Sequence, residues 1–340
     1  MTNTETDGMD HFICPEFRLN PMKCRASCPV RACSGNNPPL LPYEGDSHPM
    51  SSPRSVTTLL LALAACFVPA VGDAQEPPTP APQSAAAATD QWRGYTRHRF
   101  EVSGHKAWVV EPADPLPGKP WTWCTEFPDA FTDRTGVPQL LAKGIHHAHI
   151  SDFNRLGCEE QLRLMDEFHK VMVSKGFATR VGLIGISRGG FMAYRWAQRN
   201  PEKVVFIYGD APVCDLKSWP GGLGKGKGSP KDWQHAKNLY GWKSDEEAKA
   251  FRENALDEKP LSRLAAAKIP LLHVVGDADE VVPVAENTAI LAERYRNLGG
   301  DITVIHHAAG HHPHGLDDPA PVVRFMLGHL TSVDPAGPDH

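Results

Sequence analysis

A serine that stands between glycines, where a strand-like segment meets a helix-like one, is the feature that most constrains this chain. The apolar run at 181–184 is typical of a buried strand, and Gly-Ile-Ser-Arg-Gly follows it at 185–189. The apolar-rich segment after this turn is typical of a helix that ends at Asn200. A serine on so sharp a turn has a strained backbone, and Gly185 and Gly189 remove side chains that would collide there.

The helix that begins at this turn directs backbone N–H groups and its positive dipole end toward the hydroxyl of Ser187. The pattern Gly-x-Ser-x-Gly, in the order strand, turn and helix, makes this serine a candidate nucleophile. The alternative is a glycine-rich turn with an idle serine. An acid and a base farther along the chain would argue against that alternative.

The composition is that of a globular protein. The chain has 340 residues, which allow one large domain or two small ones, and 41% of them are hydrophobic. The formal net charge is -5, and this mildly acidic balance does not favour nucleic acid as a partner.

The first 91 residues are interpreted as segments outside the folded domain. Residues 1–49 are polar, proline-rich and aperiodic, and we interpret them as a disordered, non-native extension upstream of the true start at Met50. Residues 50–74 have the positive start, apolar stretch and small residues of a signal peptide. The apolar stretch is shorter than the about 20 residues that span a bilayer. Residues 75–91 are expected to be a disordered linker, and residues 333–340 a disordered tail.

This order of segments predicts a secreted or periplasmic protein, with two alternatives left open. The three cysteines of the extension that lie close together could ligate zinc; they are Cys24, Cys28 and Cys33. The residues before Cys66 resemble a bacterial lipobox, which would make this cysteine a lipid anchor. The apolar run continues past Cys66, however, and this favours ordinary cleavage near Gly72 or Ala74.

Strand-like and helix-like segments alternate in the folded domain, residues 92–332. The expected strands are 95–102, 106–110, 121–125, 145–150, 181–184, 204–208, 270–276 and 301–306. The expected helices, besides the one after the serine, are 137–143, 159–174, 245–255, 284–298 and 320–330. A hairpin followed by strand–helix units predicts an α/β fold, with a mostly parallel sheet and helices on both faces. A long insertion rich in Gly, Lys and Trp interrupts this rhythm at 210–242.

The domain retains an odd number of cysteines, so at least one thiol is free or buried; they are Cys124, Cys158 and Cys214. For the first two, a role as small core hydrophobes is the simplest interpretation.

Candidates for the acid and the base follow two late strands. A serine hydroxyl needs a base within hydrogen-bond reach, and the base needs a carboxylate that orients it. In a parallel sheet such groups belong at the carboxyl ends of later strands. Asp277 and Asp279 follow the expected strand 270–276, while His311 and His314 follow the strand 301–306. The order along the chain is therefore serine, aspartate, histidine.

These three segments together resemble the α/β-hydrolase superfamily, and within it the secreted esterases and prolyl-oligopeptidase-like catalytic domains. The resemblance covers about residues 92–330 and implies an α/β-hydrolase fold without metal or organic cofactor. It makes Ser187 the nucleophile, Asp279 the acid and His311 the base. His314 is the reserve base and Asp277 the reserve acid, because both patterns are doubled.

Other roles remain open for these residues. The aspartates could cap the following helix. A histidine cluster could bind a metal ion. Three further histidines on an expected strand could be core or surface residues; they are His146, His147 and His149.

The resemblance also implies an oxyanion hole, in which two donors face the developing negative charge. One donor would be the backbone N–H of Arg188. The second is expected near Glu126 and Phe127, although the familiar His-Gly pair is absent there. Glucuronoyl esterases also carry arginine directly after the nucleophile, where its guanidinium can help to hold the oxyanion. A solvated or salt-bridged arginine is the alternative for Arg188.

The insertion supplies the candidate substrate contacts. Trp219 could stack on a sugar ring, and Lys225 and Lys227 could meet a carboxylate or sulfate, unless they belong to an ordinary surface loop. With export, these residues favour a carboxylic ester hydrolase that acts on small-molecule or polysaccharide esters, such as acyl or uronate esters. A prolyl-oligopeptidase-like serine peptidase is the enzymatic alternative, although a chain of this length lacks room for a gating propeller. A non-catalytic binding protein on a hydrolase fold is the alternative of another class.

Overall fold

The computed structural model describes residues 88–331. The expected upstream extension, signal peptide and C-terminal tail, and Cys66, lie outside the described residues, as does nearly all of the expected linker. In the described part of the chain, no helix combines the length and the apolar character needed to cross a bilayer.

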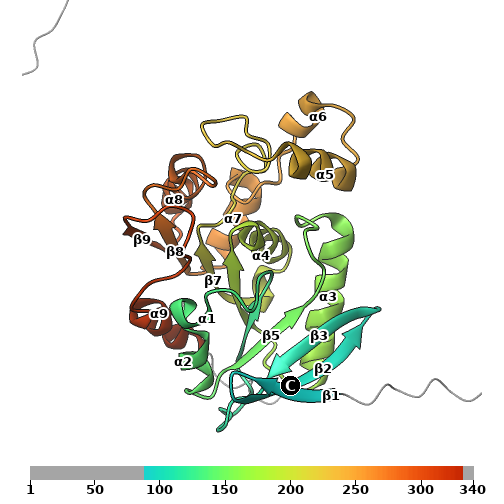
Figure 1. Cartoon of the computed structure of the whole chain (residues 1–340), viewed down its shortest axis with the longest axis vertical. Coiled ribbons are helices and arrows are strands. Elements are labelled where there is room, and N and C mark those ends of the chain that lie inside the picture. Colours follow the sequence, from blue (N-terminus) through green and yellow to red (C-terminus); the bar gives the residue numbers. More distant parts are fainter. Residues whose placement is uncertain (1–87, 332–340) are drawn as a thin grey trace, which may run out of the picture. The chain divides into compact units, whose positions relative to one another are not determined.

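One sheet of nine strands forms the centre of the domain, in the order β1-β2-β3-β5-β4-β6-β7-β8-β9 (Figure 1). The strands are β1 Ala88–Trp92, β2 Tyr95–Val102, β3 His105–Val110, β4 Trp121–Cys124, β5 His146–Ile150, β6 Val181–Ile186, β7 Val204–Asp210, β8 Leu271–Gly276 and β9 Ile302–His307. The first three strands and β5 pair antiparallel, and the pairs from β5 to β9 are parallel. The mostly parallel sheet expected from the sequence is confirmed.

Helices cover both faces of this sheet (Figure 1). They are α1 Thr132–Thr135, α2 Val137–Leu141, α3 Glu159–Ser174, α4 Arg188–Arg199, α5 Pro230–Tyr240, α6 Asp245–Lys249, α7 Glu258–Ala266, α8 Thr288–Asn297 and α9 Ala320–Leu330. Helices α3, α4, α7 and α8 belong to one apolar core, and α2 and α9 belong to the other. The bounds of α3 and α9 are those predicted from the sequence, 159–174 and 320–330.

The alternation of side chains along each strand separates the two cores. On β4, Trp121 and Trp123 face the first core, and Cys124 faces the second. Trp123 is fully buried and contacts Phe168 of α3 and Trp196 of α4, with ring centroids 4.8 and 5.2 Å apart. Burial of each such side chain contributes about 1.5–3 kcal/mol to folding.

Four details of the predicted secondary structure are wrong. Residues 88–91 are not part of a disordered linker, because β1 pairs with β2 along its whole length. The insertion 210–242 is not one loop, because α5 begins after the N-cap Ser229 and ends at Tyr240, before the C-cap Gly241; the Gly-rich surroundings obscured this capping pattern. The predicted helix 245–255 ends at Lys249, and α7 was not predicted. The predicted helix 284–298 is divided at Asn287, whose backbone is not helical.

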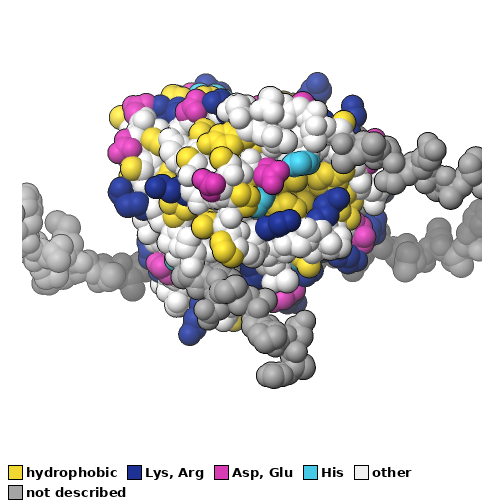
Figure 2. Space-filling view, turned by 90° about the horizontal axis from the view of Figure 1, so that it is seen from below, with side chains coloured by type: hydrophobic (Ala, Val, Ile, Leu, Met, Phe, Trp, Pro, Cys, Tyr) yellow, Lys and Arg dark blue, Asp and Glu magenta, His cyan; other side chains and the backbone are white. Residues whose placement is uncertain are grey.

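The three free cysteines of the domain are all buried, as expected for small core residues. On the face seen in Figure 2, acidic and basic side chains lie interspersed among hydrophobic and neutral ones.

The strand histidines left open by the sequence are core residues. His146, His147 and His149 of β5 are 3%, 1% and 7% exposed, and His273 of β8 is fully buried. Burial lowers the pKa of His147 and His273 to about 3, and the pKa of His146 and His149 to about 4. The ring of His273 is held by Tyr194 Oη at 2.6 Å and Thr288 Oγ1 at 2.9 Å.

We expect these histidines to make the domain sensitive to acid. His273 stays neutral in the folded protein down to about pH 3, whereas in the unfolded chain it takes up a proton near its ordinary pKa of 6.5. Its contribution to stability is complete above pH 6.5 and is lost as the pH falls toward 3. The change is about 1.4 kcal/mol per pH unit for one histidine. The variant His273→Gln should reduce the pH dependence of the free energy of unfolding by about this slope between pH 6 and 4.

Denaturant unfolding at a series of pH values would measure this slope. The control is His306→Gln, which removes an exposed histidine. An unchanged slope in His273→Gln would show that His273 is protonated in the folded protein.

Candidate active site

The turn that carries Ser187 joins β6 to α4, as the sequence predicted. Ser187 has φ 52° and ψ -122°, a conformation that is strained for a residue with a side chain. A Cβ atom on Gly185 would lie 2.5 Å from the Cα of Gly190, and one on Gly190 would lie 2.4 Å from the Cβ of Pro212. Close backbone packing therefore holds the turn. Gly190 matters as much as the glycines at 185 and 189 on which the pattern rests.

The backbone of Ser187 is fixed on both sides, by the last residue of β7 and by the segment just after it. Its N–H donates to the carbonyl oxygen of Asp210 at 2.8 Å, and its own carbonyl accepts from the N–H of Val213 at 3.0 Å. The hydroxyl is left at the carboxyl end of the sheet, next to the loops that follow β8 and β9.

Three of the predicted residues form one chain of hydrogen bonds. Ser187 Oγ lies 3.0 Å from Nε2 of His311, and Nδ1 of His311 lies 2.7 Å from Oδ2 of Asp279. The other carboxylate oxygen of Asp279 accepts the N–H groups of Val281 and Val282 at 2.9 and 2.8 Å. The side chains of His311 and Asp279 are only 8% and 1% exposed. This arrangement holds the proton of His311 on Nδ1 and leaves Nε2 to accept the serine proton.

The two reserve residues lie outside this chain of hydrogen bonds. Asp277 pairs with His306 at 2.7 Å, and both side chains are more than half exposed. His314 is buried and pairs through Nδ1 with Asp210 at 2.7 Å. Sequence reasoning missed Asp210, whose signal was an aspartate at the carboxyl end of the strand after the serine helix.

The loop after β4 packs against the first turn of α4. The hydroxyl of Thr125 donates to the carbonyl of Gly189 at 2.7 Å, and Phe127 has the left-handed φ of 60°. The first N–H groups of a helix lack partners within it, so the N–H of Arg188 is available to an anion beside Ser187. The backbone of Glu126 therefore packs beside Gly189, and the second oxyanion donor near Glu126 and Phe127 stays a prediction.

The side chain of Arg188 forms an ion pair, in agreement with the alternative of a salt-bridged arginine. Its Nε and Nη2 donate to Oε1 of Glu126 at 3.0 and 2.8 Å. Its guanidinium carbon lies 4.9 Å from the ring centroid of Phe127 and 4.4 Å from that of Phe153. We call this contact the Glu126–Arg188 pair. It joins the residue after the nucleophile to the loop of the second expected donor.

The two carboxylate oxygens of buried Glu126 differ in their hydrogen bonds. Its Oε1 also accepts the N–H of Asn154 at 3.1 Å, whereas Oε2 is buried without a hydrogen-bond partner among the described residues. Burial raises the pKa of Glu126, and the Arg188 guanidinium opposes this shift.

The candidate substrate residues of the insertion are engaged elsewhere. Trp219 is partly buried and packs against the first core. The Nζ of Lys227 pairs with Glu280 at 2.6 Å on the surface, and the backbone N–H of exposed Lys225 donates to Glu286. The insertion therefore packs beside the loop of Asp279, and the substrate contacts expected from these three residues stay predictions.

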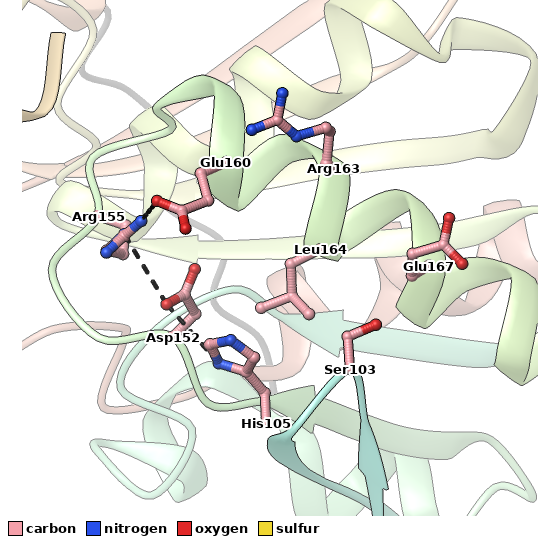
Figure 3. A pocket seen from close by; sticks show the side chains of 8 residues that line it. All are labelled: Ser103, His105, Asp152, Arg155, Glu160, Arg163, Leu164 and Glu167. Atoms are coloured by element: carbon pink, nitrogen blue, oxygen red, sulfur yellow. Dashed lines mark hydrogen bonds and ion pairs between the residues drawn. The ribbon is translucent and has the colours of Figure 1, made fainter. Parts of the chain in front are cut away.

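A cavity of about 280 Å³ lies between α3, the β2–β3 turn and the loop after β5 (Figure 3). Its charged residues neutralise one another: Asp152 faces His105 and Arg155, and Arg155 also pairs with Glu160. The lining includes no residue of the serine–histidine–aspartate chain. We assign no function to this cavity.

A group of histidines beside the serine could hold a metal ion. Within residues 88–331, the ligating atoms of His311, His312 and His314 all lie within 4.8 Å of one another.

Comparison with known proteins agrees with this geometry. Residues 165–330 match the family model "Prolyl oligopeptidase family" (Peptidase_S9). "Acylamino-acid-releasing enzyme 2" of Oryza sativa subsp. japonica is 28% identical over 139 residues, which are 38% of this chain and 16% of the relative.

Solved structures show the same fold. A puromycin-hydrolyzing peptidase of Mycobacterium tuberculosis superposes with a TM-score of 0.54 at 16% identity, over 69% of this chain and 38% of that one. An acylaminoacyl peptidase of Pyrococcus horikoshii gives a TM-score of 0.52 at 15% identity, over 72% and 42% of the two chains. The present chain thus spans less than half the length of these relatives.

The match from 165 to 330 contains the strained serine, the aspartate after β8 and the histidine after β9. This part of the chain is similar to the prolyl oligopeptidase family, peptidase S9, and the domain has the α/β-hydrolase fold of the solved structures.

Proposed function

We propose that this protein is a serine hydrolase of the S9 type that cleaves acylated amino-acid or peptide bonds through an acyl-enzyme. The observation that carries the proposal is the chain of hydrogen bonds from Ser187 through His311 to Asp279. An intact chain of this kind also argues against a binding protein that merely has the hydrolase fold.

The geometry supports a two-step acyl transfer. Ser187 Oγ attacks the carbonyl carbon of the substrate while His311 Nε2 takes the hydroxyl proton. The tetrahedral intermediate then expels the amine, which receives this proton from His311. Water next attacks the acyl-serine, gives its proton to the same nitrogen, and the acid product leaves as Ser187 regains its proton. Asp279 stabilises the imidazolium that forms in each step.

The developing oxyanion would be held by the backbone at the start of α4 and in the loop after β4. We propose the N–H of Arg188 as one donor and the N–H of Phe127 as the other, with Glu126 as the residue that anchors this loop. Such donors act best when they are fixed before the reaction, and loss of one costs about 3 kcal/mol of barrier. The Glu126–Arg188 pair supplies this fixation, because it joins the two backbone segments.

Amide substrates are favoured over the esters of polysaccharides that the sequence suggested. The relatives that match are named as acylamino-acid-releasing and puromycin-hydrolyzing enzymes. The insertion gives no support for a glycan, because Trp219 packs against the core and Lys227 pairs with Glu280. Export by the segment 50–74 remains part of the proposal, and N-terminal sequencing of the native protein would test it.

Replacement of the nucleophile is the first test of the mechanism. We expect Ser187→Ala to lose labelling by a fluorophosphonate and to lose at least a thousandfold in kcat/KM, since the acyl-enzyme cannot form. Ser174→Ala, which changes an exposed serine on α3, is the matched control and should label like the wild type. Labelling that persists in Ser187→Ala would assign the nucleophile to another residue.

The substrate class is tested by direct comparison of leaving groups. We expect acetyl-alanyl p-nitroanilide to be hydrolysed by the wild type and not by Ser187→Ala, because the S9 relatives cleave amide bonds. The panel includes p-nitrophenyl acetate and acetylated and uronate-ester glycans. Hydrolysis confined to the esters would overturn the peptidase assignment and restore the ester hydrolase.

The Glu126–Arg188 pair leads to a prediction about the oxyanion donors. Glu126→Gln should lower kcat about tenfold with little change in KM, because the oxyanion donors are present but less well fixed. Arg188→Lys should have a similar effect, and the double variant should be less than additive, since the two residues act as one unit. Asp133→Asn, which breaks the exposed pair with Arg93, is the control. A rise in KM alone would indicate substrate binding instead of fixation.

A further inference from the structure

Three histidines after β9 form a compact group around one point. The ring centroid of His311 lies 4.9 Å from those of both His312 and His314, and the latter two lie 4.8 Å apart. The planes are inclined to one another by 72° to 87°. Zinc binds imidazole nitrogens at about 2.0–2.1 Å in a tetrahedron, which places the centres of three bound rings about 5 Å apart. The ring centroids have this spacing, and the ligating atoms of the three histidines all lie within 4.8 Å of one another.

Two of the rings are oriented by buried carboxylates. The carboxylate of Asp279 accepts a hydrogen bond from Nδ1 of His311, and the carboxylate of Asp210 accepts one from Nδ1 of His314, each at 2.7 Å. The side chains of Asp210 and Asp279 are each 1% exposed. A carboxylate on one ring nitrogen fixes the tautomer and makes the other nitrogen a better metal ligand. Both histidines therefore have Nε2 as the nitrogen left for a ligand.

Two buried carboxylates lie behind the ligands, and the neighbouring guanidinium of Arg134, which donates to the carbonyls of His314 and Gly315, is itself paired with Asp317. Among residues 88–331, no Lys or Arg nitrogen lies within 4.0 Å of either buried carboxylate, and the ion pairs of both are with histidines. The remaining partners of Asp210 are neutral: the hydroxyl of Tyr208 and the N–H of Gly315.

One aromatic side chain encloses the group. Phe131 stacks on His312 at 5.8 Å and meets His314 edge-on at 5.3 Å. His314 is buried beneath it, while His312 is exposed and gives an ion access from solvent.

We propose that His311, His312 and His314 form a Zn²⁺ site whose occupation reversibly inhibits the enzyme. The ion takes the lone pair of His311 Nε2, which otherwise accepts the hydrogen bond of Ser187, so the serine loses its base. A water molecule completes the tetrahedron. The proposed Zn²⁺ binding depends only on the three histidines. The proposed inhibition rests on the proposed function as well.

Metal titration of the purified, metal-free full chain tests binding without any substrate. We expect wild type and Ser187→Ala to bind Zn²⁺ alike, and His312→Gln to bind at least tenfold more weakly. Asp210→Asn, which removes a carboxylate behind the ligands, should weaken binding about 10- to 100-fold. His306→Gln, an exposed histidine outside the group, is the control. Equal affinity in His312→Gln and wild type would overturn the site.

A spectroscopic probe separates this site from the cysteines of residues 1–49. Co²⁺ at three histidines should give the visible bands of a tetrahedral complex without thiolate charge-transfer absorption. Tetrahedral bands that remain in His312→Gln and carry thiolate absorption would place the metal on the cysteines and overturn the proposal.

Hydrolysis and fluorophosphonate labelling then test inhibition, with each variant compared with its own metal-free rate. We expect Zn²⁺ to suppress both in the wild type, a chelator to restore them, and His312→Gln to require at least tenfold more Zn²⁺. Zn²⁺ binding with undiminished hydrolysis would overturn the inhibitory role. Absence of hydrolysis in the metal-free protein would instead count against the proposed function, and the titration would still decide the site.

Discussion

The strained backbone of Ser187 is the constraint on which the rest of the site depends. A positive φ at a residue with a side chain persists only where its surroundings leave no alternative. Here β6 and α4 pass so close that Gly185 and Gly190 meet without room for a Cβ, and Pro212 closes the other side. The backbone of β7 also holds the serine N–H. The hydroxyl is therefore aimed by the packing of three elements and not by its own preference.

The parallel sheet then determines what can reach that hydroxyl. Strands β8 and β9 end at the same edge as β6, so the loops that follow them meet above the serine. Asp279 is held by two backbone N–H groups and in turn holds His311. On the other side, the Glu126–Arg188 pair attaches the loop after β4 to the first turn of α4. Each element of the site is thus held in place by hydrogen bonds or ion pairs from a neighbouring element.

The sequence predicted the parts of this site that depend on local pattern. The serine turn, the order of Ser187, Asp279 and His311, and the long amphipathic helix α3 follow from glycine spacing and hydrophobic period. A choice between two aspartates or two histidines could not follow from such patterns. Asp277 and Asp279 both follow β8 closely, and only the fold shows that one turns outward to His306 while the other is buried.

Long-range partners decide the roles that the sequence left open. Whether Arg188 is solvated or paired depends on Glu126, which lies 62 positions away in the sequence. The role of Asp210 depends on His314, 104 positions away. The sequence also left open whether Trp219 contacts a ligand or belongs to an ordinary surface loop, and in the structure its partly buried side chain packs against the first core. Composition describes a segment, whereas the exposure of its side chains depends on what the rest of the chain places beside it.

The pairing of Asp210 with His314 shows why the same edge can serve two kinds of chemistry. The strand ends bring two buried carboxylates within reach of one histidine-rich loop, and each carboxylate orients a ring. A single oriented imidazole beside a serine is a general base. Two oriented imidazoles with a third beside them are a ligand set for a transition metal. His311 belongs to both sets, and its Nε2 can hold either the serine proton or an ion. Catalysis and metal binding at this site therefore exclude each other, because His311 Nε2 has a single lone pair.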